Sequence, residues 1–557
     1  MKQKTYRRGI SLIVLVITII IMIIIAAAII LSLNGSGVIQ KGTSAVLKSD
    51  MKNIQAEYDN YVANKTLDSL GQFKVETLNA DKTSLSYSGQ PEGETGNVFN
   101  IIPSASGKYG DKIKIINGKL YYEYETAEEM NTINDMDGVS SVIKEDMLDI
   151  RDGVLMGFKE DADEELTAGT MIIPSTVTSI YSPGGYGALF ATNKKIRGVV
   201  IQPNSITEIP NYTFIMCSAI EEVVIPEGFG TIGQGAFQGT GLKKVNIKNV
   251  NTIGMEAFKS CDSLETVDIK NVNTIGMEAF GYCDGLKTAN IENVNILENG
   301  TFQGSSLETA TIKGNGSTKV GTDYGVFALC SNLKTVYIEN VAEISDSAFY
   351  GSGVETVTIK GNGSTKIGTD SSVFAQCSNL KTVTMENVGD ICDYAFYTSS
   401  VETVTIIGNG STKVGMTYGP FSSCSNLKTV YIENINSVCD LAFQGSSVET
   451  VTIKGNGSTS IGERCFQSCS NLTQIILDGI GEIELCAFWG CDALNSAVIP
   501  ATITNIGERI FERCPNIDPI QLRAASLNGV TTHAKWNYET VDGTEVPKEY
   551  VLGYAGD

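Results

Sequence analysis

The sequence predicts an α/β solenoid of short parallel strands with little helix, preceded by a long apolar helix and a small β-containing segment. Phe302, Phe349, Phe396 and Phe443 recur every 47 residues, and each period also holds one Gly-Asn-Gly-Ser-Thr segment. Each period contains two units, of 22 and 25 residues. A unit of this size buries its apolar face only by stacking on copies of itself. An uncharged apolar run over residues 10–33 predicts the helix.

Residues 1–9 read as a basic leader and residues 10–33 as a transmembrane helix, since the run is long enough to cross a bilayer once. Four basic residues precede it: Lys2, Lys4, Arg7 and Arg8. The positive-inside rule then places the N-terminus in the cytoplasm and the rest of the chain outside the cell. A plain uncleaved signal anchor is one interpretation.

The other interpretation comes from the junction at residues 7–12, Arg-Arg-Gly-Ile-Ser-Leu, which resembles the leader of a type IV prepilin. The resemblance implies cleavage after Gly9 and a mature chain that starts at Ile10. In that family the fifth residue after the cut is usually Glu, which supports filament docking and methylation of the new N-terminus. Here it is Val14, so both properties stay open.

Residues 34–70 predict an extracytoplasmic helix. Its apolar residues recur in alternating steps of four and three: Leu47, Met51, Ile54, Tyr58 and Tyr61. Such a stripe predicts a helix that is apolar on one side. The stripe would contact either a parallel helix or the segment that follows.

Residues 71–150 carry no repeat and predict a small β-containing spacer. Residues 112–116 and 119–124 have the pattern of two strands joined by Asn117-Gly118. Because Asn-Gly accepts positive φ at both positions, the pattern predicts a hairpin with a type I′ turn.

Residues 151–520 predict the solenoid. In each unit a Phe marks a tight bend, and alternating aliphatic residues such as Val267 and Ile269 face one side of a short strand. The Phe column has fifteen members: Phe190, Phe214, Phe237, Phe258, Phe280, Phe302, Phe327, Phe349, Phe374, Phe396, Phe421, Phe443, Phe466, Phe488 and Phe511.

This pattern resembles the leucine-rich repeats of bacterial BspA-like surface proteins, with units of the form Ile-Gly-x-x-Ala-Phe-x-x-Cys-x-x-Leu-x-x-Val-x-Ile-Pro. The resemblance covers residues 170–520 or so and implies a cell-surface protein with protein or glycan partners. It also implies that partners bind on the concave strand face. Residues 521–557 would cap the last coil.

The strand face supplies the candidate binding residues. Acidic and basic residues flank each strand and alternate in sign from one coil to the next, except at Ile407. A threonine column runs between them, and Tyr337 and Tyr431 interrupt a second column. Charge cancellation favours a structural role for this face, whereas exposed tyrosines favour binding. The candidates are Tyr337, Tyr431, Ile407, Thr335, Thr382 and Thr429.

Composition excludes other partners and chemistries. The net charge is -22, from 63 acidic and 41 basic residues, which argues against nucleic acid as a ligand. Nine of the thirteen cysteines lie three residues after a column Phe, where a small buried side chain fits, so we expect free thiols. Cys465, Cys469, Cys486 and Cys491 have spacings like those of a zinc site, but packing explains them better.

We expect no catalytic residue, no metal and no cofactor. The single histidine, His533, lies in the tail without a nucleophile motif nearby. The sequence therefore predicts a membrane-anchored bacterial surface protein that acts as a binding or adhesion scaffold. The alternative is a minor pilin or pseudopilin that displays the solenoid on a filament with pilin-like subunits.

Overall fold

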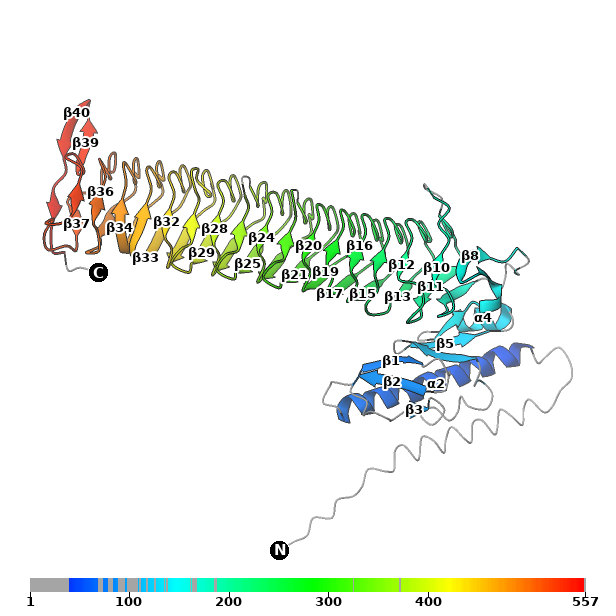
Figure 1. The fold of residues 1–557 in the computed structure, drawn as a ribbon. Coiled ribbons are helices and arrows are strands. Elements are labelled where there is room, and N and C mark those ends of the chain that lie inside the picture. The colour runs from blue at the N-terminus through cyan, green and yellow to red at the C-terminus, as the bar shows by residue number, and fades with distance from the viewer. Residues whose placement is uncertain are drawn as a thin grey trace, which may run out of the picture. The chain divides into compact units, whose positions relative to one another are not determined.

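The computed structural model is shown in Figure 1. The residues it describes are 40–68, 74–78, 84–88, 96–97, 109, 112–116, 119–124, 127–134, 136, 139–160, 162, 168–184, 188–323, 325–369 and 372–554. The chain divides into two compact units. The first comprises Met1–Ser179 and Lys194–Ser205, and the second comprises Ile180–Asn193 and Ile206–Asp557.

The first unit contains a long helix and a mixed sheet. Helix α2 spans Gln40–Asp68 and α4 spans Ala127–Asn134. Its sheet has the strand order β11-β9-β6-β5-β4-β1-β2-β3. The strands are β1 Lys74–Leu78, β2 Ser84–Ser88, β3 Gly96–Asn97, β4 Ile113–Ile116, β5 Lys119–Glu123, β6 Val139–Val142, β9 Gly169–Ile173 and β11 Ile196–Ile201. A 3-10 turn, η2 Glu145–Met147, leads into a separate antiparallel hairpin of β7 Leu148–Arg151 and β8 Val154–Phe158.

The apolar stripe of α2 packs within this unit. Leu47, Met51, Ile54 and Tyr58 are at most 7% exposed and share one buried cluster with residues of β4 and β5. The Tyr109 hydroxyl also donates a hydrogen bond to an α2 carboxylate, that of Asp50. Of the two interpretations of the stripe, packing against the following segment is therefore the one that the structure has.

Among the described residues, no helix is long and apolar enough to cross a membrane. The expected membrane helix over residues 10–33, together with Gly9 and Ile10, lies outside the described residues. Anchoring and processing both stay predictions.

The predicted hairpin after residue 111 is confirmed at its strands. β4 and β5 pair antiparallel, with Ile116 opposite Lys119, so two residues connect them. Asn117 and Gly118 themselves lie outside the described residues.

The second unit is a solenoid in which each coil contributes one longer and one shorter strand (Figure 1). The longer strands are β15 Lys244–Lys248, β17 Thr266–Lys270, β19 Thr288–Glu292, β21 Thr309–Lys313, β23 Thr335–Glu339, β25 Thr356–Lys360, β27 Thr382–Glu386, β29 Thr403–Ile407 and β31 Thr429–Glu433. Each pairs parallel with its counterpart in the next coil without a register shift, as β23 does with β25. This confirms the predicted parallel solenoid.

The shorter strands form a second parallel ladder. They are β12 Glu208–Ile209, β14 Thr231–Ile232, β16 Thr252–Ile253, β18 Thr274–Ile275, β20 Ile296–Leu297, β22 Lys319–Val320, β24 Glu343–Ile344, β26 Lys366–Ile367, β28 Asp390–Ile391, β30 Lys413–Val414 and β32 Ser437–Val438. Strand β13 spans Glu222–Val224, and β10, Ser179–Ile180, lies at the division between the units. β33, Thr450–Ile461, and β34, Gln474–Ile483, run through both ladders.

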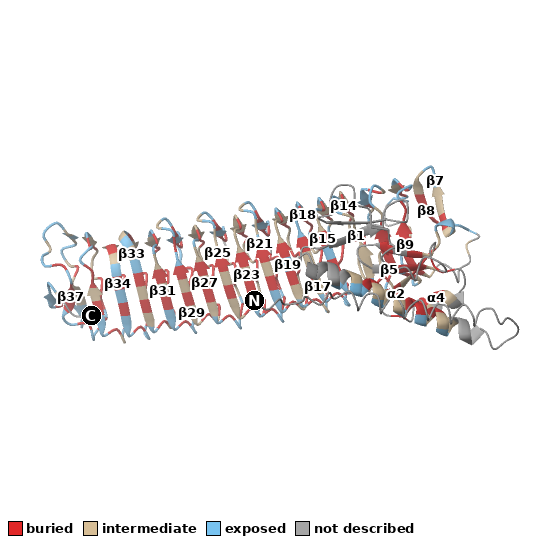
Figure 2. Ribbon diagram, turned by 90° about the horizontal axis from the view of Figure 1, so that it is seen from below, coloured by how far each residue is buried: buried red, intermediate tan, exposed pale blue. Residues whose placement is uncertain are grey.

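The Phe column fills the solenoid interior. Consecutive rings from Phe190 to Phe511 stack with centroids 4.7 to 5.5 Å apart and planes at most 19° from parallel. The residues of the longer strands alternate between buried and more exposed (Figure 2). Because the rings repeat at the spacing of neighbouring strands, each coil presents an apolar surface that only the next coil covers.

The cysteine column has a polar role as well as a packing role. Each of its nine thiols donates a hydrogen bond of 2.8 to 3.2 Å to the carbonyl of the column Phe in the preceding coil. Where serine replaces cysteine, as at Ser305, the hydroxyl donates to the Phe of its own coil instead. All thirteen cysteines are buried and unbridged.

The repeated Gly-Asn-Gly-Ser-Thr segments form turns with an internal hydrogen-bond network. The buried Thr365 hydroxyl donates to the Val341 carbonyl at 2.6 Å and accepts from the Asn362 N–H at 3.1 Å. Gly363 has φ +91°, which favours glycine. The Asn362 side chain donates to the Gly316 carbonyl of the equivalent turn one period earlier. Turns two coils apart therefore contact each other directly.

The C-terminal segment covers the last coil. The final strands are β35 Ser496–Ile499, β36 Asn505–Ile506, β37 Ile520–Leu522, β38 Thr531–Thr532, β39 Tyr538–Val541, β40 Thr544–Pro547 and β41 Tyr550–Val551. β38 pairs with β36 and β41 with β37, both parallel, while β39 and β40 form an antiparallel hairpin. Trp536 is 6% exposed, and the buried Lys548 ammonium donates to the Cys514 carbonyl.

Candidate binding surfaces

The strand face is made by the outward side chains of the longer strands. Its first column is threonine in nine consecutive coils, and Thr335, Thr382 and Thr429 belong to it. Its middle column holds Tyr337 and Tyr431 in place of threonine. The predicted candidates therefore lie on one face, in regular columns rather than gathered around one point.

Charged residues at the margins of this face form ion pairs between coils. At one margin Lys381 contacts Glu355 at 2.7 Å and Lys428 contacts Glu402 at 2.8 Å. At the other, Lys270 contacts Glu292 at 2.8 Å. The predicted alternation of sign is confirmed in these pairs. Exposed pairs of this kind contribute little stability each, but they disfavour a slip by one coil.

Both candidate tyrosines have partners on their own strands. The Tyr337 hydroxyl donates to the Glu339 carboxylate at 3.0 Å, and the Tyr431 hydroxyl donates to Glu433. The Lys454 ammonium lies 5.4 Å from the centre of the Tyr431 ring. Both rings are half-buried along the sheet, so their phenol groups are already hydrogen-bonded and their rings offer limited area.

Ile407 is the exception in its column. It is 38% exposed and lies in register between Glu386 and Glu433. Every neighbouring coil from residue 270 onward places a charged residue at this position. An apolar side chain between two carboxylates leaves each with a cross-strand lysine on one side: Lys360 lies 3.6 Å from Glu386, and Lys454 is in register with Glu433.

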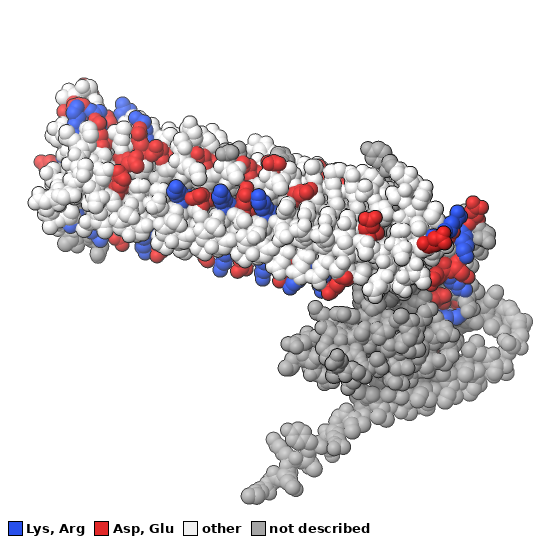
Figure 3. Space-filling model, in the orientation of Figure 1, with Lys and Arg blue, Asp and Glu red and all other residues white. Residues whose placement is uncertain are grey.

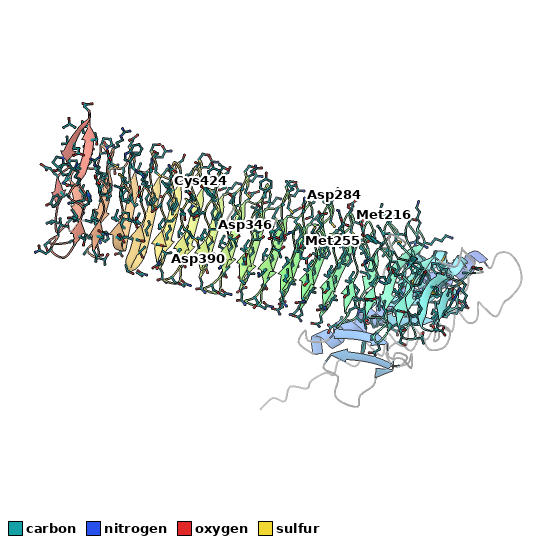
Figure 4. The ribbon with its side chains drawn as sticks, turned by 45° about the horizontal axis from the view of Figure 1, so that its top comes forward. Met216, Met255, Asp284, Asp346, Asp390 and Cys424 are labelled. Atoms are coloured by element: carbon teal, nitrogen blue, oxygen red, sulfur yellow. The ribbon has the colours of Figure 1, made fainter. Side chains whose placement is uncertain are left out.

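A second alternating charge column, which the sequence analysis missed, follows the shorter strands. It consists of Lys319, Glu343, Lys366, Asp390 and Lys413, each aligned with the next by strand order. Figure 3 shows a line of alternating basic and acidic side chains along the solenoid, and Figure 4 labels Asp390. The signal was present in the sequence, at spacings of 23 and 24 residues.

The turn face is made by the residues around each column Phe, chiefly those two positions before it and one position after it. Side chains in these turns differ sharply in exposure: Met216 is 55% exposed, whereas Cys424 is buried (Figure 4). The outward side chains differ in kind from one coil to the next. The turn face is therefore variable, whereas the strand face is regular.

A pocket of about 630 Å³ opens on the turn face near the C-terminal end. Four consecutive coils line it, with Leu441, Arg464, Cys486 and Arg509 from the position two residues before each Phe. Gln444, Gln467, Trp489 and Glu512 come from the position after it. Figure 3 shows acidic and basic side chains gathered toward this end of the solenoid. We call this site the C-terminal pocket.

A group of three tyrosines occupies the turn face two coils earlier. The Tyr394 ring lies 5.6 Å from Tyr397 and 5.4 Å from Tyr418, measured between ring centres. Tyr397 is 41% exposed and Tyr418 is 50% exposed. We call these residues the tyrosine cluster. Tyr418 shares a coil with Phe421, and the next coil carries Leu441 of the C-terminal pocket.

No group of three or more His, Cys, Asp or Glu side chains that could hold a metal ion occurs among the described residues. The four cysteines whose spacing resembles that of a zinc site are all buried. Burial raises the pKa of the Cys469 thiol to about 12 and that of the fully buried Cys465 well above its ordinary value. Both thiols are therefore protonated at neutral pH in the structure described.

The repeats match a known family. The model for BspA type leucine rich repeat regions matches six copies, over residues 166–265, 251–371, 301–418 and 415–518. These ranges together span more than half of the chain. The chain belongs to the BspA type leucine-rich repeat family.

Solved leucine-rich repeat proteins are also similar to this chain. A leucine-rich repeat protein from Bacteroides ovatus is 23% identical, with 63% of this chain and 82% of that chain covered and a TM-score of 0.37. A leucine rich cell surface protein from Faecalibacterium prausnitzii is 19% identical, with 70% and 96% covered and a TM-score of 0.28. The pneumococcal vaccine antigen PcpA is 15% identical, with 69% and 95% covered and a TM-score of 0.29. No curated protein matches the chain.

Family membership confirms the predicted repeat fold but not a binding face. The C-terminal pocket lies outside the strand-face residues that the resemblance had implied. Its signal in the sequence was a run of four coils without glycine at one repeat position: Leu441, Arg464, Cys486 and Arg509. Glycine holds the equivalent position in several other coils, including Gly235 and Gly300.

Proposed function

We propose that this BspA type repeat protein is a bacterial cell-surface scaffold that binds or adheres to protein or glycan partners. The observation that carries the proposal is an interior Phe column that is closed to solvent. The column Phe rings from Phe214 to Phe488 have no exposed surface, so the solenoid leaves ligands only its outer faces. A surface built by repetition presents many side chains in a long array, which suits contact with extended partners.

The anchoring part of the proposal rests on the sequence. Residues 10–33 form an uncharged apolar run that follows four basic residues. A helix over this run would hold the N-terminus in the cytoplasm and the repeat unit outside. Brief protease treatment of intact cells tests it. The repeat unit should be released into the medium, whereas repeats protected until the cells are lysed would contradict a surface location.

Binding is tested with the full-length protein on an array of host cells, matrix proteins and glycans. Two double variants then compare the faces. One combines Tyr337→Ala and Tyr431→Ala on the strand face, and the other combines Tyr397→Ala and Tyr418→Ala on the turn face. We expect at least one partner that binds one of these double variants more weakly than the parent protein and binds the other as tightly as the parent. No binding to any member of the array would remove the support for a scaffold.

A second candidate function, a minor pilin or pseudopilin, is favoured by helix α2. The helix begins at Gln40, shortly after the apolar run, and its stripe packs against the first unit's sheet. Mass spectrometry of the mature N-terminus tests this candidate. A chain starting at Ile10 would support it, and a chain that retains Lys2 would exclude it.

We further propose that the chain has no enzymatic activity. A purified protein that hydrolyses peptide, ester or glycosidic substrates, and loses this activity in a point variant, would contradict that proposal.

A further inference from the structure

The C-terminal pocket has the composition of a ligand site rather than of a packing defect. Its volume of about 630 Å³ falls in the range of ~300–1,000 Å³ that small-molecule sites occupy. Its side chains come from four successive turns, and all of them belong to the repeat unit. Because the Phe stack beneath it is continuous, the pocket lies above a rigid floor.

The charges of the pocket cancel. Arg464 and Arg509 are balanced by Glu508 and Glu512 among the lining residues. Arg509 lies within 3.3 Å of Glu508 and 3.8 Å of Glu512, and it also contacts Glu545. Arg464 pairs with Glu463 at 2.5 Å. Since both guanidinium groups already have carboxylate partners, an anionic ligand would have to displace those partners. The pocket therefore favours an uncharged ligand.

The uncharged lining residues are two amides and an indole, beside Leu441, Leu485 and Cys486. In the part of the chain that the structure describes, the side-chain amides of Gln444 and Gln467 have no hydrogen-bond partner. Each amide offers donors and an acceptor. The Arg513 guanidinium carbon lies 4.8 Å from the centre of the Trp489 ring, and this stacking holds the indole in place.

A neutral sugar matches these groups. Its hydroxyls exchange hydrogen bonds with amide and guanidinium groups, and the C–H bonds of its ring face pack on an aromatic surface, which is negative at its face. An apolar ligand would leave the amides and charges without partners, at a desolvation cost. A protein surface would need a broad apolar contact area, which the mostly polar lining does not supply.

The tyrosine cluster extends the same surface toward the N-terminal coils. Tyr397 and Tyr418 expose large parts of their rings, and the coil after Tyr418 begins the pocket. Consecutive coils here stack at the spacing of the rings of Phe421 and Phe443, 5.1 Å. A ligand that reached from Tyr397 to Trp489 would cross five coils, from that of Phe396 to that of Phe488. Such a length suits an oligosaccharide.

We propose that the C-terminal pocket and the tyrosine cluster bind a neutral oligosaccharide, with Trp489 as the central stacking residue and Gln444 and Gln467 as hydrogen-bonding residues. This inference rests on the proposed scaffold function and deepens it by naming one face and one class of partner.

Tryptophan fluorescence of the full-length protein tests the proposal, because the chain has only two tryptophans, Trp489 and the buried Trp536. The Trp536→Phe variant reports on Trp489 alone. The probes are cellohexaose, maltohexaose, xylohexaose and chitohexaose, titrated separately. We expect at least one of them to change the Trp489 emission in a saturable manner.

Variants then locate the site. Trp489→Ala, followed by calorimetric titration of the same hexasaccharide, should weaken binding by about tenfold or more. Gln467→Ala, which leaves the aromatic groups intact, should weaken it severalfold. Tyr418→Ala should weaken the hexasaccharide more than the corresponding disaccharide. Met216→Ala, an exposed turn residue at the other end of the solenoid, is the matched control and should leave affinity unchanged.

Three outcomes would overturn the inference: no response to any of the four probes, affinity unchanged in both Trp489→Ala and Gln467→Ala, or a Trp489-dependent interaction with a protein and with no sugar. The first two leave the proposed function intact if the array shows a partner that depends on Tyr337 or Tyr431. Failure of the whole array would remove the proposed function as well.

Discussion

The ring of Phe374 lies 4.7 Å from the ring of Phe396, centre to centre, with 8° between their planes. This is the closest contact in a stack that continues through every coil from Phe190 to Phe511. Each ring between these two ends contacts one ring before it and one after it. The stability of the solenoid is therefore a sum of contacts between neighbouring coils.

Truncation of one ring should remove two of these contacts. Phe396→Ala is expected to lower the free energy of unfolding by about 3–5 kcal/mol, since it opens a cavity that the adjacent coils close only in part. Urea titration followed by circular dichroism measures it. Tyr397→Ala, at the exposed neighbouring position, should change stability by no more than about 0.5 kcal/mol. Equal losses in the two variants would contradict the stacked core.

Ile407 lies between two carboxylates and offers a test of the strand-face charge pattern. Ile407→Lys should raise the free energy of unfolding by up to about 1 kcal/mol, because the ammonium would lie between Glu386 and Glu433. Ile407→Glu should lower it, since three carboxylates would then follow one another. The difference should shrink in concentrated salt. If a surface partner also loses affinity in Ile407→Lys, the isoleucine serves binding.

The strand-face pairs predict sensitivity to acid. Hydrogen bonding to Lys428 holds the pKa of Glu402 below its ordinary value, and Lys381 does the same for Glu355. The folded state thus binds these protons less tightly than the unfolded state does. The pairs stabilise the fold above the ordinary carboxyl range, and their contribution disappears as pH falls through the lowered pKa values.

Urea midpoints at neutral and acidic pH measure this contribution. Glu402→Gln should lose less stability on acidification than the parent protein, and the two should converge at the lowest pH that keeps the protein folded. If the urea midpoints of both proteins changed equally with pH, the pair between Glu402 and Lys428 would make no contribution to stability.

The buried threonine of each Gly-Asn-Gly-Ser-Thr turn should matter more than the serine before it. Thr365→Val removes the hydroxyl that serves both the Val341 carbonyl and the Asn362 N–H. Leaving these groups unpaired should cost about 1–3 kcal/mol of unfolding free energy. Ser364→Ala removes only a bond from an exposed hydroxyl to Asn362 and should cost much less. Thermal unfolding of the two variants under the same conditions makes the comparison.

The cysteine column should be unreactive in the native protein. Burial raises the pKa of Cys330, Cys377 and Cys424 to about 12, and the thiolate is the reactive form. A thiol reagent at neutral pH should therefore react slowly with the native protein. After denaturation it should react with all thirteen cysteines. Rapid titration of the native column, or a denatured total below thirteen without reductant, would contradict buried free thiols.

The repeat made much of the fold predictable. A buried column needs the same kind of residue in every coil. The spacing between Phe349 and Phe396 was therefore enough to assign both to the core. The period also predicted that Lys381 and Glu402 lie side by side on neighbouring strands, because the register of a parallel ladder follows from the repeat length. The stripe on α2 predicted a helix but left its partner open, since an apolar face does not say what covers it.

The C-terminal pocket could not be predicted in this way. Its residues are the ones that depart from the repeat, so no period identifies them, and their meaning depends on which side chains of adjacent turns meet. Trp489 and Gln444 lie 45 positions apart in the chain but line one pocket. The hydrogen bonds from the cysteine thiols to the Phe carbonyls were likewise invisible, because they depend on the offset between one coil and the next.

By itself, then, the sequence determined the solenoid, its period, its core columns and its parallel register, since each of these is a property of repetition. Only the tertiary structure decided where the surface is hollow, which side chains meet there and which strand-face groups are already paired. Such features arise between coils, from the packing of residues that the repeat leaves free to vary.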